Sequence, residues 1–366
     1  MKIKVTQEKL SKALNNVSRI AIGKVTLPIL NNVLIRVDNK KVSLVTTNLD
    51  MAIVDFLPVS SSEDGVVTVP AKLLAEFVSN LPKGEIIEVT SNDTKVTISA
   101  GKYSSTINGT LADDFPELPE IDEKESVTYK LSVDEFKSSM SQVIIASSND
   151  MTRPALTGVY FCTLDHTLAI AATDGYRLTE KKLIDKVESE VKAVVPNSSL
   201  QEVLRSITDD AEEVEISFSN DLVRFRLGEI EVISKLIDAS FPDYRRLIPK
   251  ESKITVSLDR EELSRVTKLA ALFSRSVGGS IICETSAPDV FAVKSIANEF
   301  GENSSQIETS VNQSGKVNLN SRFLIDALNA LDEKTITFSF SDHLAPIVLK
   351  NAKDNKYTHI IMPLNS

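Results

Sequence analysis

The sequence predicts an α+β protein of three similar domains, each with two helices and an antiparallel sheet. The first observation behind this prediction is an internal repeat. Residues 26–33 (TLPILNNV) recur as residues 152–159 (TRPALTGV), and the same offset relates Phe115-Pro116 to Phe241-Pro242. The second observation is that helical and alternating apolar patterns follow one another in the same order in each copy.

A third copy is fainter but keeps the same landmarks. Leucines correspond in the second helix of each copy, and an acid follows two positions later: Leu74 and Glu76, Leu200 and Glu202, Leu324 and Asp326. A period near 125 is too long for a solenoid repeat, so we expect domains at 1–124, 125–250 and 251–366. The acidic, Pro-rich segment 113–126 and its counterpart 240–252 are the expected linkers.

Each copy is expected to begin with a strand, at 3–5, 129–131 and 254–257. A helix follows, with Thr6, Ser132 or Ser257 near its N-terminus and acids in its first turn. Alternating strands come next, such as 33–37 and 42–46, and then a second helix at about 71–81, 197–207 and 320–331. Further strands, such as 86–90 and 96–99, bring each copy to roughly eight.

Composition excludes several classes of protein. The net charge is −10 and the pI about 5.1, which by themselves argue against nucleic acid as a partner unless charge is unevenly distributed. No apolar run approaches the roughly 20 residues that cross a bilayer, so we expect no membrane span. The N-terminus has no apolar signal region, and Cys162 and Cys283 show no pairing pattern, so a cytoplasmic location is expected.

The first helices of two copies concentrate basic residues. Lys9, Lys12, Asn16 and Arg19 are spaced to share one exposed face, beside an apolar stripe of Leu10, Ala13, Leu14, Val17 and Ala21. In the third copy Arg265, Lys268 and Arg275 repeat this spacing, while Leu263, Val266, Ala270 and Phe273 are expected to face inward. The middle copy is mostly neutral at these positions. The pattern is open to two interpretations, a solvated face or a surface for nucleic acid.

Four motifs carry a family resemblance: TLPIL at 26–30, ATDGYRL at 172–178, FPDYRR at 241–246 and IMPL at 361–364. With them the chain resembles, from end to end, the bacterial DNA polymerase III beta subunit, the sliding clamp. The resemblance implies the DNA clamp fold and a head-to-tail dimeric ring. Such a ring encircles duplex DNA without sequence specificity and confers processivity, and it has no catalytic role.

The resemblance also implies a pocket for short linear peptides from the DNA polymerase III catalytic subunit, the clamp loader and repair polymerases. Its matching positions are Leu156, Thr173, Gly175, Tyr176, Arg177, Leu178, Pro242, Arg246, Leu247, Asn320, Phe323, Leu344, Pro346, Ile360, Met362, Pro363 and Leu364. An apolar trough with a few polar groups suits such ligands. Leu156, Leu178 and Ile360 are equally compatible with core positions.

Positions implied to face DNA are Lys9, Lys12, Arg19, Lys24, Lys72, Asn149, Arg205, Arg265 and Lys268. The second copy lacks tyrosines at 152–155 and a basic pair at 197–198, which implies weak DNA affinity there. Leu272 and Phe273 match an apolar dimer interface, although the alternative for Phe273 is the helix core. The tail ends Leu364-Asn-Ser, short of the apolar or basic terminus that the resemblance leads us to expect.

No catalytic, cofactor or metal motif is evident. His166, His343 and His359 lack metal-ligand spacing, and the glycines form no phosphate-binding loop. We therefore expect no metal and no cofactor. Two alternatives to a clamp remain at this point: a hydrolase that uses loop carboxylates such as Asp113-Asp114 and Asp209-Asp210, and a repeat scaffold without a DNA role.

Overall fold

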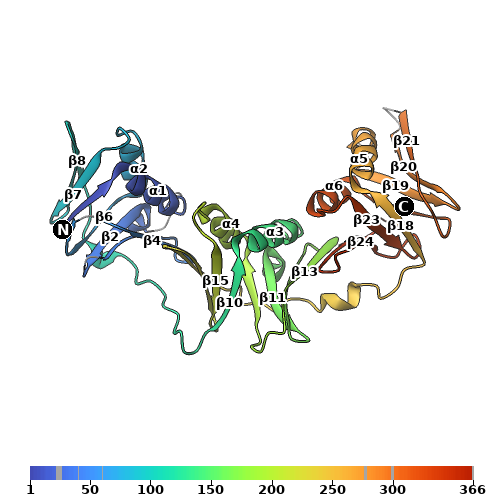
Figure 1. Cartoon of the computed structure of the whole chain (residues 1–366), viewed down its shortest axis with the longest axis horizontal. Coiled ribbons are helices and arrows are strands. Elements are labelled where there is room, and N and C mark those ends of the chain that lie inside the picture. The colour runs from blue at the N-terminus through green and yellow to red at the C-terminus, as the bar shows by residue number, and fades with distance from the viewer. Residues whose placement is uncertain (22–26, 40, 60, 276–277, 298–300, 365–366) are drawn as a thin grey trace. The chain divides into compact units, whose positions relative to one another are not determined.

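The chain packs into two compact units in the computed structural model, which describes residues 1–366 except 22–26, 40, 60, 276–277, 298–300 and 365–366 (Figure 1). The first unit comprises Met1–Phe136 and Ser198–Leu236, and the second comprises Lys137–Asn197 and Ile237–Ser366. The predicted middle copy therefore contributes to both units. The domain limits 1–124, 125–250 and 251–366 stay a prediction.

The first unit contains two antiparallel sheets, of five strands (order β5-β1-β7-β8-β9) and eight strands (order β10-β15-β16-β17-β4-β3-β2-β6). Its strands are β1 (Lys2–Thr6), β2 (Asn32–Asp38), β3 (Lys41–Thr47), β4 (Met51–Leu57), β5 (Ser61–Glu63), β6 (Gly65–Pro70), β7 (Ile86–Asn92), β8 (Lys95–Ala100), β9 (Tyr103–Asn108), β10 (Val127–Ser132), β15 (Glu213–Phe218), β16 (Leu222–Leu227) and β17 (Ile230–Lys235).

The second unit also has two antiparallel sheets, of eight strands (order β14-β11-β12-β13-β25-β24-β23-β18) and four strands (order β21-β20-β19-β22). Its strands are β11 (Gly158–Leu164), β12 (Thr167–Thr173), β13 (Arg177–Asp185), β14 (Lys192–Pro196), β18 (Ile254–Asp259), β19 (Ser280–Ser286), β20 (Val290–Ala297), β21 (Gly301–Glu308), β22 (Gly315–Asn320), β23 (Thr335–Phe340), β24 (Ile347–Asn351) and β25 (Tyr357–Ile361). Together with the first unit, this confirms the expected strand content of each copy.

Two α-helices per copy are present in the described residues, as predicted. They are α1 (Gln7–Ser18), α2 (Ala71–Ser79), α3 (Val133–Ile144), α4 (Asn197–Ser206), α5 (Arg260–Ser274) and α6 (Ser321–Ala330). Figure 1 shows α1 and α2 side by side, and likewise α5 and α6. The repeated TLPIL and TRPAL segments form short 3-10 helices, at Pro28–Asn31 and Pro154–Thr157.

In the third copy Ser257 lies near the start of the first helix, as expected, but it does not cap that helix. Ser257 lies inside β18, opposite Thr337 of β23, and the helix begins three residues later. The capping residue is Asp259, whose carboxylate accepts hydrogen bonds from the backbone N–H groups of Glu261 and Glu262. An ionised carboxylate at a helix N-terminus satisfies two otherwise unpaired donors and also interacts favourably with the helix dipole. Strand pairing therefore continues to the residue that can cap the helix.

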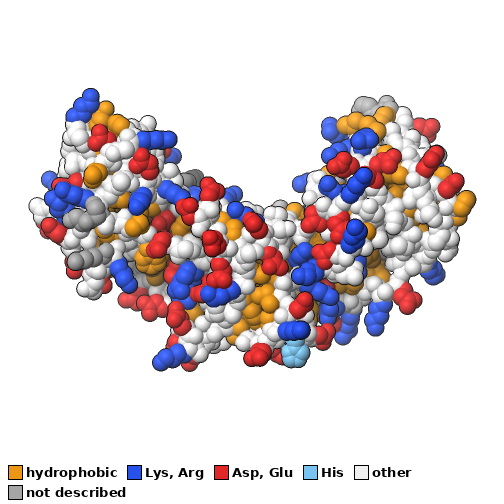
Figure 2. Space-filling model, viewed as in Figure 1, with side chains coloured by type: hydrophobic (Ala, Val, Ile, Leu, Met, Phe, Trp, Pro, Cys, Tyr) orange, Lys and Arg blue, Asp and Glu red, His pale blue; other side chains and the backbone are white. Residues whose placement is uncertain are grey.

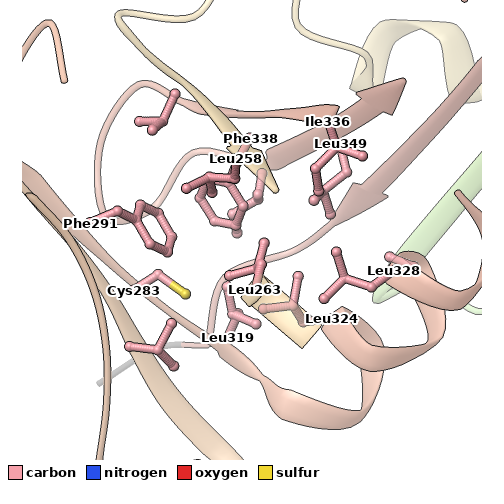
Figure 3. Packing of buried hydrophobic residues seen from close by; sticks show 14 of the residues in the cluster. Leu258, Leu263, Cys283, Phe291, Leu319, Leu324, Leu328, Ile336, Phe338 and Leu349 are labelled. Carbon is pink, nitrogen blue, oxygen red and sulfur yellow. The ribbon is translucent and has the colours of Figure 1, made fainter. Parts of the chain in front are cut away.

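The core of the third copy lies between its two helices and the facing strands (Figure 3). Leu263 of α5 and Leu324 and Leu328 of α6 are fully buried against apolar strand residues. Phe291 of β20 and Phe338 of β23 meet edge to face, with ring centroids 5.2 Å apart. This packing fixes α6, and with it the side chains that α6 presents at its surface.

Strands from successive copies pair with each other, so the sheets continue across the copy boundaries. In the first unit β4 pairs with β17, from Asp55 opposite Ile230 to Met51 opposite Ser234. In the second unit β13 pairs with β25, from Arg177 opposite Ile361 to Lys181 opposite Tyr357. By position in the repeat, β4 and β13 are equivalent, and so are β17 and β25. We call each such strand pairing, with the helices beside it, a joint.

Both predicted linkers are anchored by the repeated Phe-Pro. Phe115 is buried against Leu34, Val45 and Val54 of the first unit. In the second unit Phe241 stacks on Tyr160, with ring centroids 4.8 Å apart and planes 10° from parallel. The linkers therefore lie on the sheets as packed segments, and the second one places Arg245 Nε 3.7 Å from Glu180 Oε2 of β13.

Candidate functional site

The turn between β12 and β13 is built by Thr173, Asp174 and Gly175. The Thr173 hydroxyl donates to the Arg177 carbonyl at 2.7 Å and accepts from the Gly175 N–H at 3.1 Å. Asp174 Oδ1 accepts from the backbone N–H groups of Tyr176 and Arg177, each at 2.9 Å. Gly175 has φ +92°, a conformation that side chains disfavour. The ATDGYRL motif thus forms a rigid turn that leaves Tyr176 two-thirds exposed.

Arg177 is held by two carboxylates and an aromatic ring. Its Nε donates to Asp174 Oδ2 at 3.0 Å, and its Nη1 donates to Asp326 Oδ2 of α6 at 2.6 Å. The guanidinium carbon lies 4.6 Å from the centroid of the Phe323 ring. Only 11% of the Arg177 side chain is exposed. The predicted residues Arg177 and Phe323, from different copies, are therefore in direct contact.

The C-terminal tail runs beside this turn. The Met362 N–H donates to the Tyr176 carbonyl at 2.8 Å, and the Leu364 N–H donates to the Asn318 carbonyl at 2.8 Å. Met362, Pro363 and Leu364 are all half-buried. These backbone contacts hold the IMPL motif against the turn and the end of β22.

The remaining predicted pocket residues differ in burial. Leu156, Leu178 and Ile360 are buried, the last two in a cluster with Ala171 and Tyr244, which fits the alternative that they are core residues. Asn320 caps α6 by accepting from the Arg322 N–H at 2.9 Å. The others are exposed or half-buried: Pro242, Arg246, Leu247, Leu344 and Pro346. As a set, these residues remain a predicted site.

Three residues near this site were missed by the sequence reasoning: Asp174, Asp243 and Arg153. Asp243 Oδ2 lies 2.6 Å from Arg246 Nε. The Arg153 side chain lies beside Gly175, close enough that its Nη1 would be 3.7 Å from the Cβ of an alanine at that position. Asp326 was noted only as a repeat landmark. The sequence signal for its role is the acid that recurs in the second helix of each copy. Each of these acids forms an ion pair: Glu76 with Lys72, Glu202 with Arg19 and Arg205, and Asp326 with Arg177.

The basic residues of α1 are not all free. Lys9 and Lys12 are exposed, and Lys12 Nζ lies 3.8 Å from Asp210 Oδ2. Arg19, directly after α1, donates from Nε to Glu202 Oε2 at 2.9 Å and from Nη2 to the Ser206 hydroxyl at 2.8 Å. The expected exposure of Asn16 is wrong, because its amide is buried and donates to Asp55 Oδ2 at 3.0 Å. Burial raises the pKa of the Asp55 carboxyl, and this hydrogen bond partly offsets the effect.

The other residues predicted to face DNA are exposed wherever the structure describes them. Arg205 pairs with Glu202 and Lys72 with Glu76, whereas Arg265 and Lys268 form no ion pair with any described residue. Asn149 is exposed, and Lys24 lies outside the described residues. Cations and acids are interspersed on the face shown in Figure 2. The free cations on described helices therefore include Arg265 and Lys268 of α5.

The proposed dimer residues lie near the end of α5. Leu272 is 56% exposed, whereas Phe273, expected to face inward, is only half-buried. Leu263, Val266 and Ala270 do face inward, as predicted. The helix therefore presents an apolar edge beside its basic residues.

No group of three or more His, Cys, Asp or Glu side chains in the described part of the chain is arranged to hold a metal ion. Cys162 and Cys283 are free and buried, and burial raises the pKa of the Cys162 thiol to about 11. None of the described helices has the length and apolar character needed to span a membrane.

Comparison with known proteins gives matches along the whole chain. Family models of the DNA polymerase III beta subunit match in order: the N-terminal domain at 1–119, the central domain at 130–243 and the C-terminal domain at 245–365. The beta sliding clamp of Staphylococcus aureus strain Mu50 is 28% identical over 364 residues, 96% of each chain.

Solved structures agree along the full length. The DnaN sliding clamp of Pseudomonas aeruginosa bound to griselimycin is 25% identical, with a TM-score of 0.94 and 100% coverage of both chains. The DNA polymerase sliding clamp of Bacillus subtilis is also 25% identical, with a TM-score of 0.94, and covers 100% of this chain and 99% of that chain.

A buried histidine lies in the strand that leads to the tail. Tyr357 Oη donates to the Gln142 carbonyl at 3.1 Å, so His359 Nδ1, 2.9 Å from Tyr357 Oη, must carry a proton and donate. His359 Nε2 then has a bare lone pair, and it has no partner among the described residues. Burial, helped by the positive charge of Arg177, lowers the pKa of His359 to about 3.

We predict that His359 makes the fold sensitive to acid. The unfolded chain binds a proton at His359 near pH 6.5, whereas the folded chain does so only near pH 3. Protonation of His359 therefore leaves the unfolding free energy unchanged above pH 6.5, and lowers it by about 1.4 kcal/mol per pH unit between pH 6.5 and about pH 3. Urea titrations followed by circular dichroism should give a shallower pH dependence for His359→Gln than for the unmodified chain. The exposed His343→Gln is the control, and equal slopes for all three proteins would contradict the prediction.

Proposed function

Since the chain belongs to the DNA polymerase III beta subunit family, we propose that it is a sliding clamp that encircles duplex DNA and tethers the replicative polymerase. The observation that carries this proposal is the match of all three family domains in chain order. The expected fold, with three clamp domains, is confirmed. The clamp is non-catalytic and cytoplasmic in this proposal, which is favoured over a hydrolase or a scaffold without a DNA role.

A head-to-tail dimer follows from the joints within the chain. Each joint pairs one strand type of a copy, β4 or β13, with the last strand of the next copy, β17 or β25. The third copy's equivalent of β4 is β21, which ends its sheet, and the last strand of the first copy is β9, which also ends its sheet. Pairing β21 of one chain with β9 of another repeats the joint, and two such pairings close a ring.

The helices beside the joints support the same arrangement. The first helix of one copy contacts the second helix of the next: α1 meets α4 through Arg19 and Glu202, and α3 meets α6 where Gln142 Nε2 donates to the Ala330 carbonyl at 2.9 Å. The third copy has no following copy in the same chain whose second helix α5 could contact, and the first copy has no preceding copy whose first helix α2 could contact. Both present large exposed side chains, Leu269 and Leu272 on α5 and Leu73 on α2. Burying these apolar groups together would stabilise the dimer.

Sliding requires attraction to DNA without sequence readout. Lysine and arginine side chains attract phosphates irrespective of base sequence. Lys9 and Lys12 of α1, and Arg265 and Lys268 of α5, supply such charges on equivalent helices. The ring itself, rather than a tight contact, would keep the protein on DNA.

The partner pocket is proposed at the turn, the second linker and the tail. Tyr176, Leu247 and Leu344 offer exposed apolar surface, and Arg177 and Arg246 offer donors. This combination suits short peptides from the polymerase catalytic subunit, the clamp loader and repair polymerases. The griselimycin-bound relatives from Pseudomonas aeruginosa and Bartonella birtlesii indicate a further ligand to test.

We predict retention on circular DNA that depends on topology. With a clamp loader and ATP, the protein should stay on nicked circular duplex DNA through gel filtration and should be released when the circle is cut. A closed ring cannot leave a circle but slides off a free end. Omitting the loader is the control. Equal retention before and after linearisation would refute the encircling ring.

We predict a dimer of about twice the 40.1 kDa chain mass in sedimentation experiments at micromolar concentration. Leu272→Glu should shift it to the monomer, because a charge would be buried in the apolar contact with α2. Leu344→Glu alters a side chain of similar exposure, 58% against 56%, outside the joint and should leave the dimer intact. A monomeric unmodified chain, or an unchanged Leu272→Glu dimer, would contradict the proposal.

We predict that Arg246→Ala combined with deletion of 362–366 weakens binding of a polymerase-derived peptide by about tenfold or more. The double change removes an exposed donor and the tail whose backbone contacts Tyr176 and Asn318. Fluorescence anisotropy measures the affinity, griselimycin serves as a second probe, and sedimentation checks that the dimer persists. Unchanged peptide affinity would reject the pocket assignment.

A further inference from the structure

The two arginines of the proposed pocket are in different electrostatic states. Arg246 is exposed, with 85% of its side chain in solvent, and its one carboxylate partner, Asp243, is exposed as well. Arg177 is almost fully buried and contacts two carboxylates, Asp174 and Asp326. The group formed by Arg177, Asp174 and Asp326 therefore carries more negative than positive charge.

This arrangement limits what Arg177 can bind. A guanidinium has five N–H donors, and Asp174 and Asp326 occupy one on Nε and one on Nη1. The remaining N–H groups can still donate to an incoming oxygen. A third carboxylate is disfavoured there, because like charges close together in a partly buried site repel. A neutral carbonyl accepts the same hydrogen bond without that repulsion.

Each carboxylate is itself fixed by the fold. Asp174 is held by the backbone N–H groups of Tyr176 and Arg177. Asp326 lies on α6 between the buried Leu324 and Leu328, and Phe323 from the same helix stacks on the guanidinium. Arg177 therefore cannot turn toward an acid without leaving both partners, whereas Arg246 is free to do so.

We propose that Asp326 is a positioning residue that, together with Asp174, makes Arg177 a donor for neutral carbonyl groups and so excludes acidic side chains from this part of the pocket. The inference rests on the proposed partner pocket and adds a rule of selectivity to it. The ligand class is a peptide segment that presents an uncharged amide or backbone carbonyl to Arg177. Acidic residues are accepted only near Arg246.

The test uses the full-length chain and one synthetic probe. An acetylated and amidated apolar hexapeptide that binds the unmodified chain is chosen from a library, and its binding must be lost with Arg246→Ala and deletion of 362–366. Each position is then replaced in turn by glutamine or glutamate. At the position that faces Arg177, we expect glutamate to bind at least about tenfold more weakly than glutamine.

Asp326→Asn should reduce this glutamine-to-glutamate ratio by about threefold or more at that one position, because one negative charge is removed. The matched control is Asp332→Asn, which changes a carboxylate bonded to Asn351 rather than to Arg177. Asp174→Asn is the second variant should Asp326→Asn fail to fold. A purely structural role would weaken both peptides equally.

Two failures are distinguishable. An unchanged ratio at every position, in a variant that still binds the parent peptide, overturns the role of Asp326 and leaves the pocket in place. Failure of the unmodified chain to bind any library member, or binding that survives the pocket deletion, overturns the pocket itself and the selectivity rule with it.

Discussion

Backbone pairing between successive copies is the constraint on which the rest of the structure depends. β4 continues into β17, and β13 continues into β25, so backbone donors and acceptors at the copy boundaries are satisfied by another copy. The linkers at 113–126 and 240–252 consequently do not hold the copies together by themselves. They are free to lie on the sheets, where Phe115 and Phe241 anchor them.

The joints also determine which basic side chains are already held in ion pairs and which are left exposed. Glu202 pairs with Arg205 of the same helix and with Arg19, and only the second pair joins α4 to the end of α1. An arginine engaged in this way contributes less to attraction for phosphate. Lys9, Lys268 and Arg265 remain exposed, whereas α3 carries one lysine against two acids.

The sequence predicted the fold well because its signals were local or repeated. Apolar periodicity located the helices, and alternating apolar residues located strands such as 33–37 and 42–46. Helix caps were harder, since Ser257 and Asp259 are both plausible and only strand pairing selects the second. Asn16 is buried because it bonds to Asp55, and Arg177 is fixed partly by its bond to Asp326. Both acids are far away in the chain, so no local pattern reveals these contacts.

The unpaired edges of β9 and β21 have a consequence for the chain before it assembles. An exposed edge strand is a template for any other strand, and a head-to-tail contact that does not close can extend indefinitely. Neither β9 nor β21 contains a proline, and β9 holds no charged residue that would discourage such pairing. In the proposed ring both edges are paired at once, which also protects the chain against aggregation.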